Sequence, residues 1–284
     1  MFQKKLKNNA KYYIELPGML SDCIGDVTID QKYAIVQIHP TYSLAIVPFE
    51  KESHPTYEVV IFYSNCLAYE HELPVSIYTK KKKFYIEPIT NTTNRRSYEI
   101  ITQVYETMND IRFGSGIVSF RYPGFIKEVD LQYSTKYHGA EKELSLYATA
   151  LRQIDPLSEF LCYYRIIESI TGGNGKDWID SNIHRIGTYN FGFLDFGDMA
   201  YFHKTKRRTN LFSLYRRKAI SRINILNKRL PPGKISYYLY NEVRCGIAHG
   251  KNIKEYDFDY NVMEISKDNF IMKMLSRIAI EDKI

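Results

Sequence analysis

Residues 155–173, DPLSEFLCYYRIIESITGG, predict a complete helix with both of its ends. Asp155 can accept hydrogen bonds from the exposed backbone N–H groups of the first turn, and Pro156 suits the first helical position. The apolar side chains that follow recur at helical spacing, and they are Leu157, Phe160, Leu161, Tyr164, Ile167 and Ile170. Gly172 and Gly173 then end the helix, because glycine readily adopts the left-handed conformation that closes many helices.

Helical periodicity extends on both sides of this segment, from about Gln132 to the last residues of the sequence. Before it, four apolar residues share one helical face: Leu144, Tyr147, Ala148 and Leu151. After it, residues 178–203 are rich in aromatic residues and glycine, and we expect them to form a partly ordered connection. Further helices are predicted at about residues 210–227, 234–249 and 269–280. Residues 132–284 are therefore expected to form an all-α helical bundle.

The first half of the chain has short β-branched and aromatic runs between turn-forming residues. Such runs predict strands of an antiparallel sheet. They cover residues 33–38, 43–49, 57–63, 74–78, 84–87 and 117–122. A helix at residues 100–111, capped by Ser97, is expected to interrupt them. The basic run Lys80–Lys83 is interpreted as a solvated hairpin tip. The predicted fold class is α+β, with a β-rich module at residues 1–131 whose role would be sensory or regulatory.

The composition fits a soluble cytoplasmic protein. Hydrophobic residues make up 44% of the 284 positions, which is enough for packed cores. The four cysteines Cys23, Cys66, Cys162 and Cys245 have no paired spacing, as expected in a reducing compartment. The N-terminal residues lack the apolar run of a secretory signal, and no stretch approaches the roughly 18 apolar residues of a membrane span. The net charge of +7 permits a polyanionic partner.

Residues 240–250, YNEVRCGIAHG, hold the most informative pair of polar side chains. Arg244 and His249 lie five positions apart near the end of a predicted helix. A histidine has an unperturbed pKa of about 6.5, so it can accept or donate a proton near neutral pH. An arginine keeps its charge and can hold two phosphate oxygens. Together, such a pair can cleave RNA without a metal ion or another cofactor.

The segment resembles the R-x4-6-H motif of the HEPN superfamily, a group of helical domains that includes many metal-independent endoribonucleases. Residues 160–170, FLCYYRIIESI, resemble the aromatic, glutamate-bearing first core helix of these domains. His249-Gly250 is similar to the usual ending of the motif. The resemblance covers about residues 132–284, and nothing comparable is found for the first half.

The resemblance implies transesterification, in which a ribose 2′-OH attacks the adjacent phosphate. His249 would be the general base or acid, Arg244 would stabilise the developing charge, and Glu168 would orient Arg244. Because five positions turn a regular helix by about 140°, the two side chains should not share a face unless Gly246 bends the helix. The alternative is a homodimer in which two copies of the motif meet in one cleft. The family also implies a toxin or antiphage setting, with a possible regulatory partner protein.

A basic segment precedes the motif. Residues 199–241 contain no Asp or Glu, whereas a solvated helix normally mixes both signs. Charge of one sign favours a phosphate-binding surface, although the aromatic residues of the segment could equally form a core face. The residues expected to bind RNA are Lys204, Lys206, Arg207, Arg208, Arg216, Arg217 and Arg222.

Two other functions remain open. In the HEPN superfamily a polar Asn or Asp often follows the motif arginine, but here Cys245 follows it. A non-catalytic RNA- or protein-binding module would suit this departure, with Arg244 paired to Glu168 or Glu242. The second alternative is a scaffold that uses its tyrosine-rich sheet as a protein interface. No metal site is expected, and the loop Gly172–Lys176 lacks the spacing of a phosphate-binding loop.

Overall fold

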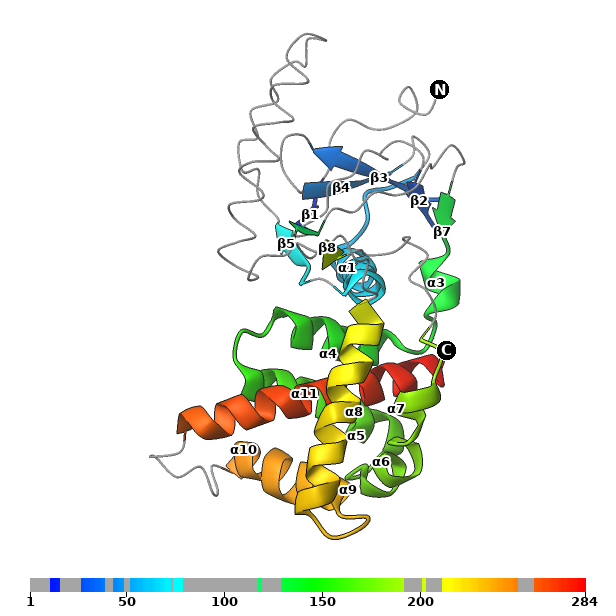
Figure 1. Ribbon diagram of the computed structural model, residues 1–284. Coiled ribbons are helices and arrows are strands. Elements are labelled where there is room, and N and C mark those ends of the chain that lie inside the picture. Colours follow the sequence, from blue (N-terminus) through cyan, green and yellow to red (C-terminus); the bar gives the residue numbers. More distant parts are fainter. Residues whose placement is uncertain are drawn as a thin grey trace. The chain divides into compact units, whose positions relative to one another are not determined.

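The computed structural model describes residues 11–15, 27–38, 43–48, 52–72, 74–78, 117–118, 129–191, 201–202, 211–249 and 258–284. The chain divides into two compact units (Figure 1). One comprises residues 1–67, 75–136 and 193–211, and the other comprises residues 68–74, 137–192 and 212–284. None of the helices in the described stretches is both long enough and apolar enough to cross a membrane.

The first unit contains a six-stranded sheet with the order β5-β1-β4-β3-β2-β7. Its strands are β1 (Tyr13–Glu15), β2 (Val27–Ile29), β3 (Tyr33–Ile38), β4 (Ser43–Pro48), β5 (Ser76–Tyr78) and β7 (Val129–Leu131). All pairings are antiparallel except that of β2 with β7. A separate pair joins β6 (Ile117–Val118) to β8 (Tyr201–Phe202). The strands predicted at residues 33–38 and 43–49 are therefore present as β3 and β4, with β4 ending at Pro48.

The strand predicted at residues 57–63 is wrong, because these residues begin the helix α1 (Tyr57–His71). The Thr56 hydroxyl accepts a hydrogen bond from the Val59 N–H at 3.4 Å and so caps the first turn. Residues 63–70 are all buried, so the helix shows no polar face to reveal its period. The helix is also linked to the turn that follows β2, because the Tyr63 hydroxyl donates a hydrogen bond to the Asp30 carboxylate at 2.8 Å.

The described part of the second unit is helical, which confirms the all-α character expected for the C-terminal region. Its helices are α4 (Glu141–Arg152), α5 (Pro156–Thr171), α6 (Lys176–Asn182), α7 (Arg185–Thr188), α8 (Leu211–Arg229), α9 (Ile235–Tyr237), η2 (Tyr238–Arg244), α10 (Cys245–His249) and α11 (Phe258–Glu281). The short helix α3 (Tyr133–Lys136) precedes them in the first unit. Helix α11 is the central element: residues 271–280 are all buried, and α5 packs along it (Figure 1).

Local signals account for the ends of α5. The Asp155 carboxylate accepts hydrogen bonds from the N–H groups of Leu157 and Ser158, and Pro156 occupies the first turn. At the other end, Gly172 has a φ of 66° and its N–H donates to the Glu168 carbonyl. The cap, the first residue and the stop predicted for this helix are all confirmed.

Two predictions in the helical region are corrected. Residues 178–182 and 185–188, expected within a partly ordered connection, belong to α6 and α7, which bury Ile179 and Ile186. The last helix begins at Phe258 rather than near residue 269. Phe258, Val262 and Ile265 already recur at helical spacing before residue 269, and the prediction passed over this pattern. The strand predicted at 84–87, the helix at 100–111 and the basic run Lys80–Lys83 lie outside the described residues. The β-rich character of residues 1–131 as a whole stays a prediction.

Candidate functional site

The segment that carries Arg244 and His249 is not the single regular helix expected from the sequence. It consists of the short helix α9, the π-helix η2 and the short helix α10. The Cys245 N–H donates to the carbonyl of Tyr240, five residues earlier, which is the hydrogen bond of a π-turn. Such turns are rare and occur frequently at functional sites. Arg244 is the last residue of this π-helix.

The π-helix ends at Arg244, and residues 245–249 are α-helical. The rotation from Arg244 to His249 therefore remains about 140°, and Gly246 does not bring the two side chains onto one face. His249 is exposed at the end of α10. No hydrogen bond or ion pair joins it to Arg244, both residues being among those described. Within one chain the structure does not bring the two predicted catalytic side chains together.

Arg244 does meet Glu168, the residue expected to orient it. The Arg244 Nη2 lies 2.9 Å from the Glu168 Oε1, and the two side chains are 27% and 23% exposed. Burial opposes the charged form of Arg244, but the Glu168 carboxylate and Cys245 outweigh it and raise the arginine pKa. Glu242 is exposed, and among the described residues it forms no ion pair with Arg244. The guanidinium is thus permanently charged, held on one side and still open to solvent.

An aromatic platform lies beneath this guanidinium. The Arg244 Cζ is 5.8 Å from the centre of the Tyr240 ring, and the Lys176 Nζ is 5.2 Å from the same centre. Tyr240 contacts Tyr164 of α5 at a ring separation of 6.0 Å. The sequence reasoning missed Tyr164, Lys176 and Tyr240. The spacing of Tyr240 and Arg244, four positions apart, is the signal that could have identified the platform.

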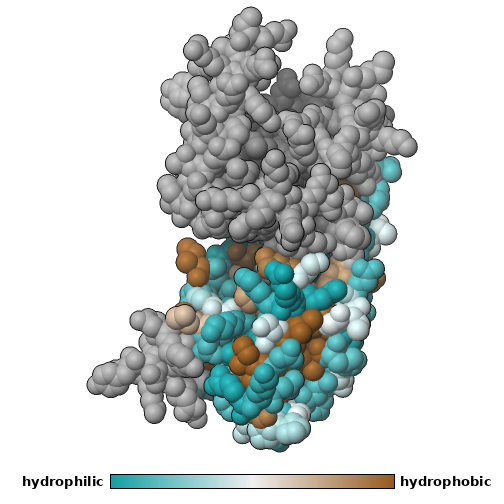
Figure 2. Space-filling model, in the orientation of Figure 1, coloured by the Kyte–Doolittle hydropathy of each residue, from teal (hydrophilic) through white to brown (hydrophobic). Residues whose placement is uncertain are grey.

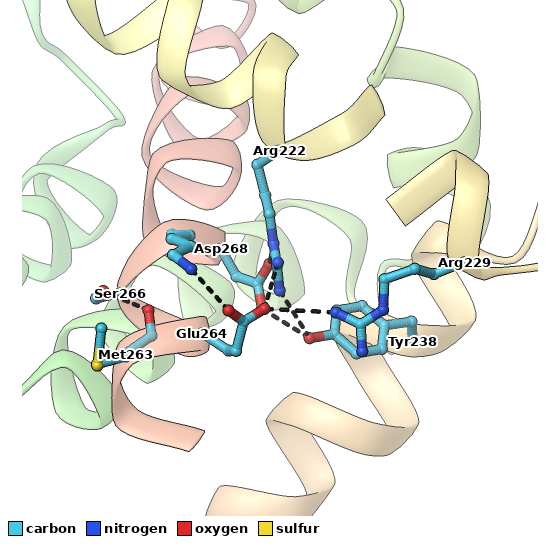
Figure 3. Close-up of polar contacts among 8 residues, drawn as sticks. Arg222, Arg229, Tyr238, Met263, Glu264, Ser266 and Asp268 are labelled. Atoms are coloured by element: carbon cyan, nitrogen blue, oxygen red, sulfur yellow. Dashed lines mark hydrogen bonds and ion pairs between the residues drawn. The ribbon is translucent and has the colours of Figure 1, made fainter. Parts of the chain in front are cut away.

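Arg222 is a correction to the predicted RNA-binding set. Its side chain is 3% exposed and lies between two carboxylates of α11, Asp268 at 2.6 Å and Glu264 at 2.5 Å (Figure 3). The Tyr238 hydroxyl completes the cluster by donating to Asp268 at 2.9 Å. Burial is the main cause that raises the pKa of Asp268, against the bonds from Arg222 and Tyr238. Arg222 therefore joins helices in the interior and does not present its charge to a ligand.

The other residues expected to bind RNA fall into three groups. Arg216 is partly buried and donates to the backbone carbonyl of Tyr189. Arg217 is exposed on α8, as a phosphate-binding residue would be. Lys204, Lys206, Arg207 and Arg208 lie outside the described residues. The face of the helical unit in Figure 2 is mostly hydrophilic with scattered hydrophobic side chains.

The described residues contain no group of three or more His, Cys, Asp or Glu side chains placed to hold a metal ion. Cys245 is a free, partly buried cysteine beside Arg244. The side chains gathered around Arg244 are the Glu168 carboxylate, the Lys176 ammonium and the rings of Tyr164 and Tyr240.

Comparison with known proteins links the helical region to one family. Residues 144–281 match the family model described as methylamine utilization protein MauJ. No curated protein and no solved structure matches the chain. The matched segment contains α5, α8, η2 and α10, and so includes Glu168, Arg244 and His249. The similarity thus falls on the same part of the chain as the resemblance to HEPN domains, without naming that superfamily.

Proposed function

We propose that the helical region is an endoribonuclease of the HEPN type, with Arg244 and His249 as its catalytic residues. The observation that carries the proposal is the placement of Arg244. Its guanidinium is held by Glu168 at 2.9 Å at the end of a π-turn, yet remains 27% exposed. A guanidinium that is fixed, charged and accessible can donate two hydrogen bonds to phosphate oxygens, and it can therefore stabilise the negative charge of a phosphorane.

The proposed reaction is an internal transesterification. The ribose 2′-oxygen attacks the adjacent phosphorus, and the bond from phosphorus to the 5′-oxygen breaks. The 2′-OH loses its proton to a base, and the departing 5′-oxygen gains one. The products are a 2′,3′-cyclic phosphate and a 5′-OH. His249 serves in one of these proton transfers, because imidazole exchanges protons near neutral pH.

The geometry favours a site that two chains share. Arg244 and His249 diverge by about 140° within one chain, so one copy does not present both side chains to one phosphate. In the proposed homodimer, one copy supplies the arginine and the other supplies the histidine. Each copy would then contribute to both composite sites, as expected for a two-fold symmetric contact.

A second candidate function is a non-catalytic module that binds RNA or a protein partner. It is favoured by Cys245, which stands where the HEPN motif often has a polar residue. It is also consistent with the pair between Arg244 and Glu168, because an arginine whose charge is already balanced can serve structure alone. A role in toxin or antiphage systems and a regulatory partner belong to the nuclease proposal, by analogy with the family.

The test is cleavage of a mixed RNA pool by the purified protein in EDTA, with analysis of the product ends. We expect cyclic-phosphate ends with the wild type and no cleavage with Arg244→Ala or His249→Ala. Arg165→Ala and His184→Ala are the matched controls, because both residues are exposed and lie outside the motif and outside the set expected to bind RNA. Equal cleavage by all variants would indicate a contaminating nuclease and reject the proposal.

Mixing the two inactive variants tests the shared site. If one composite site takes Arg244 from one chain and His249 from the other, a mixed dimer contains one intact site and regains cleavage. If each site instead lies within a single chain, the mixed dimer contains no intact site and regains no cleavage. If wild-type protein binds RNA without cutting it, the non-catalytic module is the better description.

A further inference from the structure

A loop without an assigned role brings a second cation to the candidate site. The loop Gly172–Lys176 joins α5 to α6, and its last residue reaches Tyr240. The Lys176 Nζ and the Arg244 Cζ lie 5.2 Å and 5.8 Å from the centre of that ring. Two positive groups from distant parts of the sequence therefore share one aromatic platform.

The backbone of this loop is held in place on both sides. Gly175 has a φ of 73°, and a Cβ at this position would lie 2.6 Å from the Ile167 Cγ2. Only glycine allows the loop to pack this closely on α5. The Tyr164 hydroxyl donates to the Asn174 carbonyl at 2.7 Å, so the ring that contacts Tyr240 also anchors the loop.

Helix α6 is in turn tied to the segment that leads into the π-helix. The Ser236 hydroxyl donates to the Asp180 carboxylate at 2.7 Å, and Ser236 is buried. Lys176, at the start of α6, therefore has a fixed base from which its side chain extends over Tyr240. Its position does not depend on a flexible loop, and the cost of ordering it on ligand binding is reduced.

The charges at this place are not balanced. Glu168 neutralises Arg244, but no carboxylate of the described residues forms an ion pair with Lys176. Lys176 is also only partly buried, so its ammonium can reach a ligand. An ammonium presents three donors as a compact charge, which matches a phosphate oxygen well.

We propose that Lys176 binds an RNA phosphodiester next to the one that Arg244 holds. Both cations lie within 5.8 Å of the centre of the Tyr240 ring, so a ligand that reaches one of them is close to the other. This role rests on the proposed function, because it takes RNA as the occupant of the site. It adds a substrate-positioning residue that lies 68 positions before Arg244 in the sequence.

The test is binding of a fluorescent 2′-O-methyl RNA oligonucleotide, which lacks the attacking hydroxyl and is not cleaved. Lys176→Ala should weaken binding about fivefold to tenfold at low salt, the loss of one charged contact. It should also reduce the slope of log affinity against log salt by about 0.7. Lys176→Arg should restore most of the affinity. Lys142→Ala, which removes an exposed lysine of α4, is the matched control and should change little.

The outcomes separate the two proposals. If the wild type binds RNA and Lys176→Ala binds equally well, Lys176 only packs on Tyr240 and the inference is wrong, while the proposed function stands. An equal loss with Lys142→Ala would show non-specific attraction and would also reject the inference. If the wild type does not bind RNA, the proposed function itself fails. Urea unfolding of each variant checks that the fold is unchanged.

Discussion

Two arginines of the helical unit, Arg222 and Arg244, are both paired with acids from another helix, yet their surroundings differ. Arg222 is 3% exposed and lies between two carboxylates of α11 (Figure 3). Arg244 is 27% exposed and meets one carboxylate, Glu168. A buried charge with several partners is committed to the fold, whereas a half-exposed charge with one partner remains available to a ligand.

The two clusters hold opposite ends of the same π-helix. Tyr238, the first residue of η2, donates to Asp268 in the cluster of Arg222. Arg244, the last residue of η2, is held by Glu168 of α5. The comparison therefore separates a structural anchor at one end from a candidate site at the other. Substitutions at the buried end should therefore affect mainly stability, and substitutions at the half-exposed end should affect mainly activity.

The largest effect on stability is expected from Asp268→Asn. This change removes a fully buried partner of Arg222 and leaves a buried positive charge with less compensation. Breaking such a pair from one side typically costs about 3–5 kcal/mol of unfolding free energy, and the remaining bond to Glu264 places the expected loss near the lower value. Urea unfolding followed by circular dichroism measures it. A loss below about 1 kcal/mol would mean that this cluster is no more structural than the pair at Arg244.

The features that are determined by local chemistry, such as helix ends, were predicted best from the sequence. Helix α5 was predicted with its cap at Asp155 and its stop at Gly172, because both signals act within one turn of the helix end. Helix α1 was mistaken for a strand because its first half, residues 57–63, is rich in β-branched and aromatic residues, and the buried run 63–70 that follows has no exposed face to reveal a helical period. The π-helix was not predicted, and the side chains that contact its two ends, Glu168 of α5 and Asp268 of α11, lie far from it in the sequence.

The candidate site was predicted only in part. The motif pointed to Arg244 and His249, and the glutamate of the first core helix pointed to Glu168, which the structure brings to Arg244. The loop of Lys176 was considered as a phosphate-binding loop and set aside, and its contact with Tyr240 could not be inferred because the two lie far apart in the sequence. The interpretation of Arg222 failed for the opposite reason. The segment has no acidic residues of its own, but its partners Asp268 and Glu264 come from 46 and 42 positions further along the chain.

A smaller effect is expected from pH at the structural cluster. Hydrogen bonds from Lys267 and Arg222 outweigh the burial of Glu264 and lower its pKa below the ordinary value of 4.5. A lowered pKa in the folded state means that the stabilisation is complete above about pH 4.5 and is lost as the pH falls through the lowered value. Glu264→Gln should flatten this acid limb of the unfolding free energy. An acid limb identical to that of the wild type would show that Glu264 does not contribute to it.

The smallest change in stability is expected from Glu168→Gln, at the half-exposed end of the π-helix. A pair this open to solvent contributes up to about 1 kcal/mol, so the unfolding free energy should remain close to that of the wild type. If Arg244 acts on a phosphate, however, loss of its orienting partner should reduce RNA cleavage about tenfold to a hundredfold. Glu242→Gln is the matched control, because Glu242 lies in the same π-helix, is exposed and does not contact Arg244.

A large loss of stability in Glu168→Gln, with cleavage reduced only in proportion to the unfolded fraction, would make Arg244 a second structural anchor like Arg222. Near-normal stability with impaired cleavage, against an unaffected Glu242→Gln, would show that Glu168 acts by orienting the guanidinium, since the folded protein is equally populated in both variants.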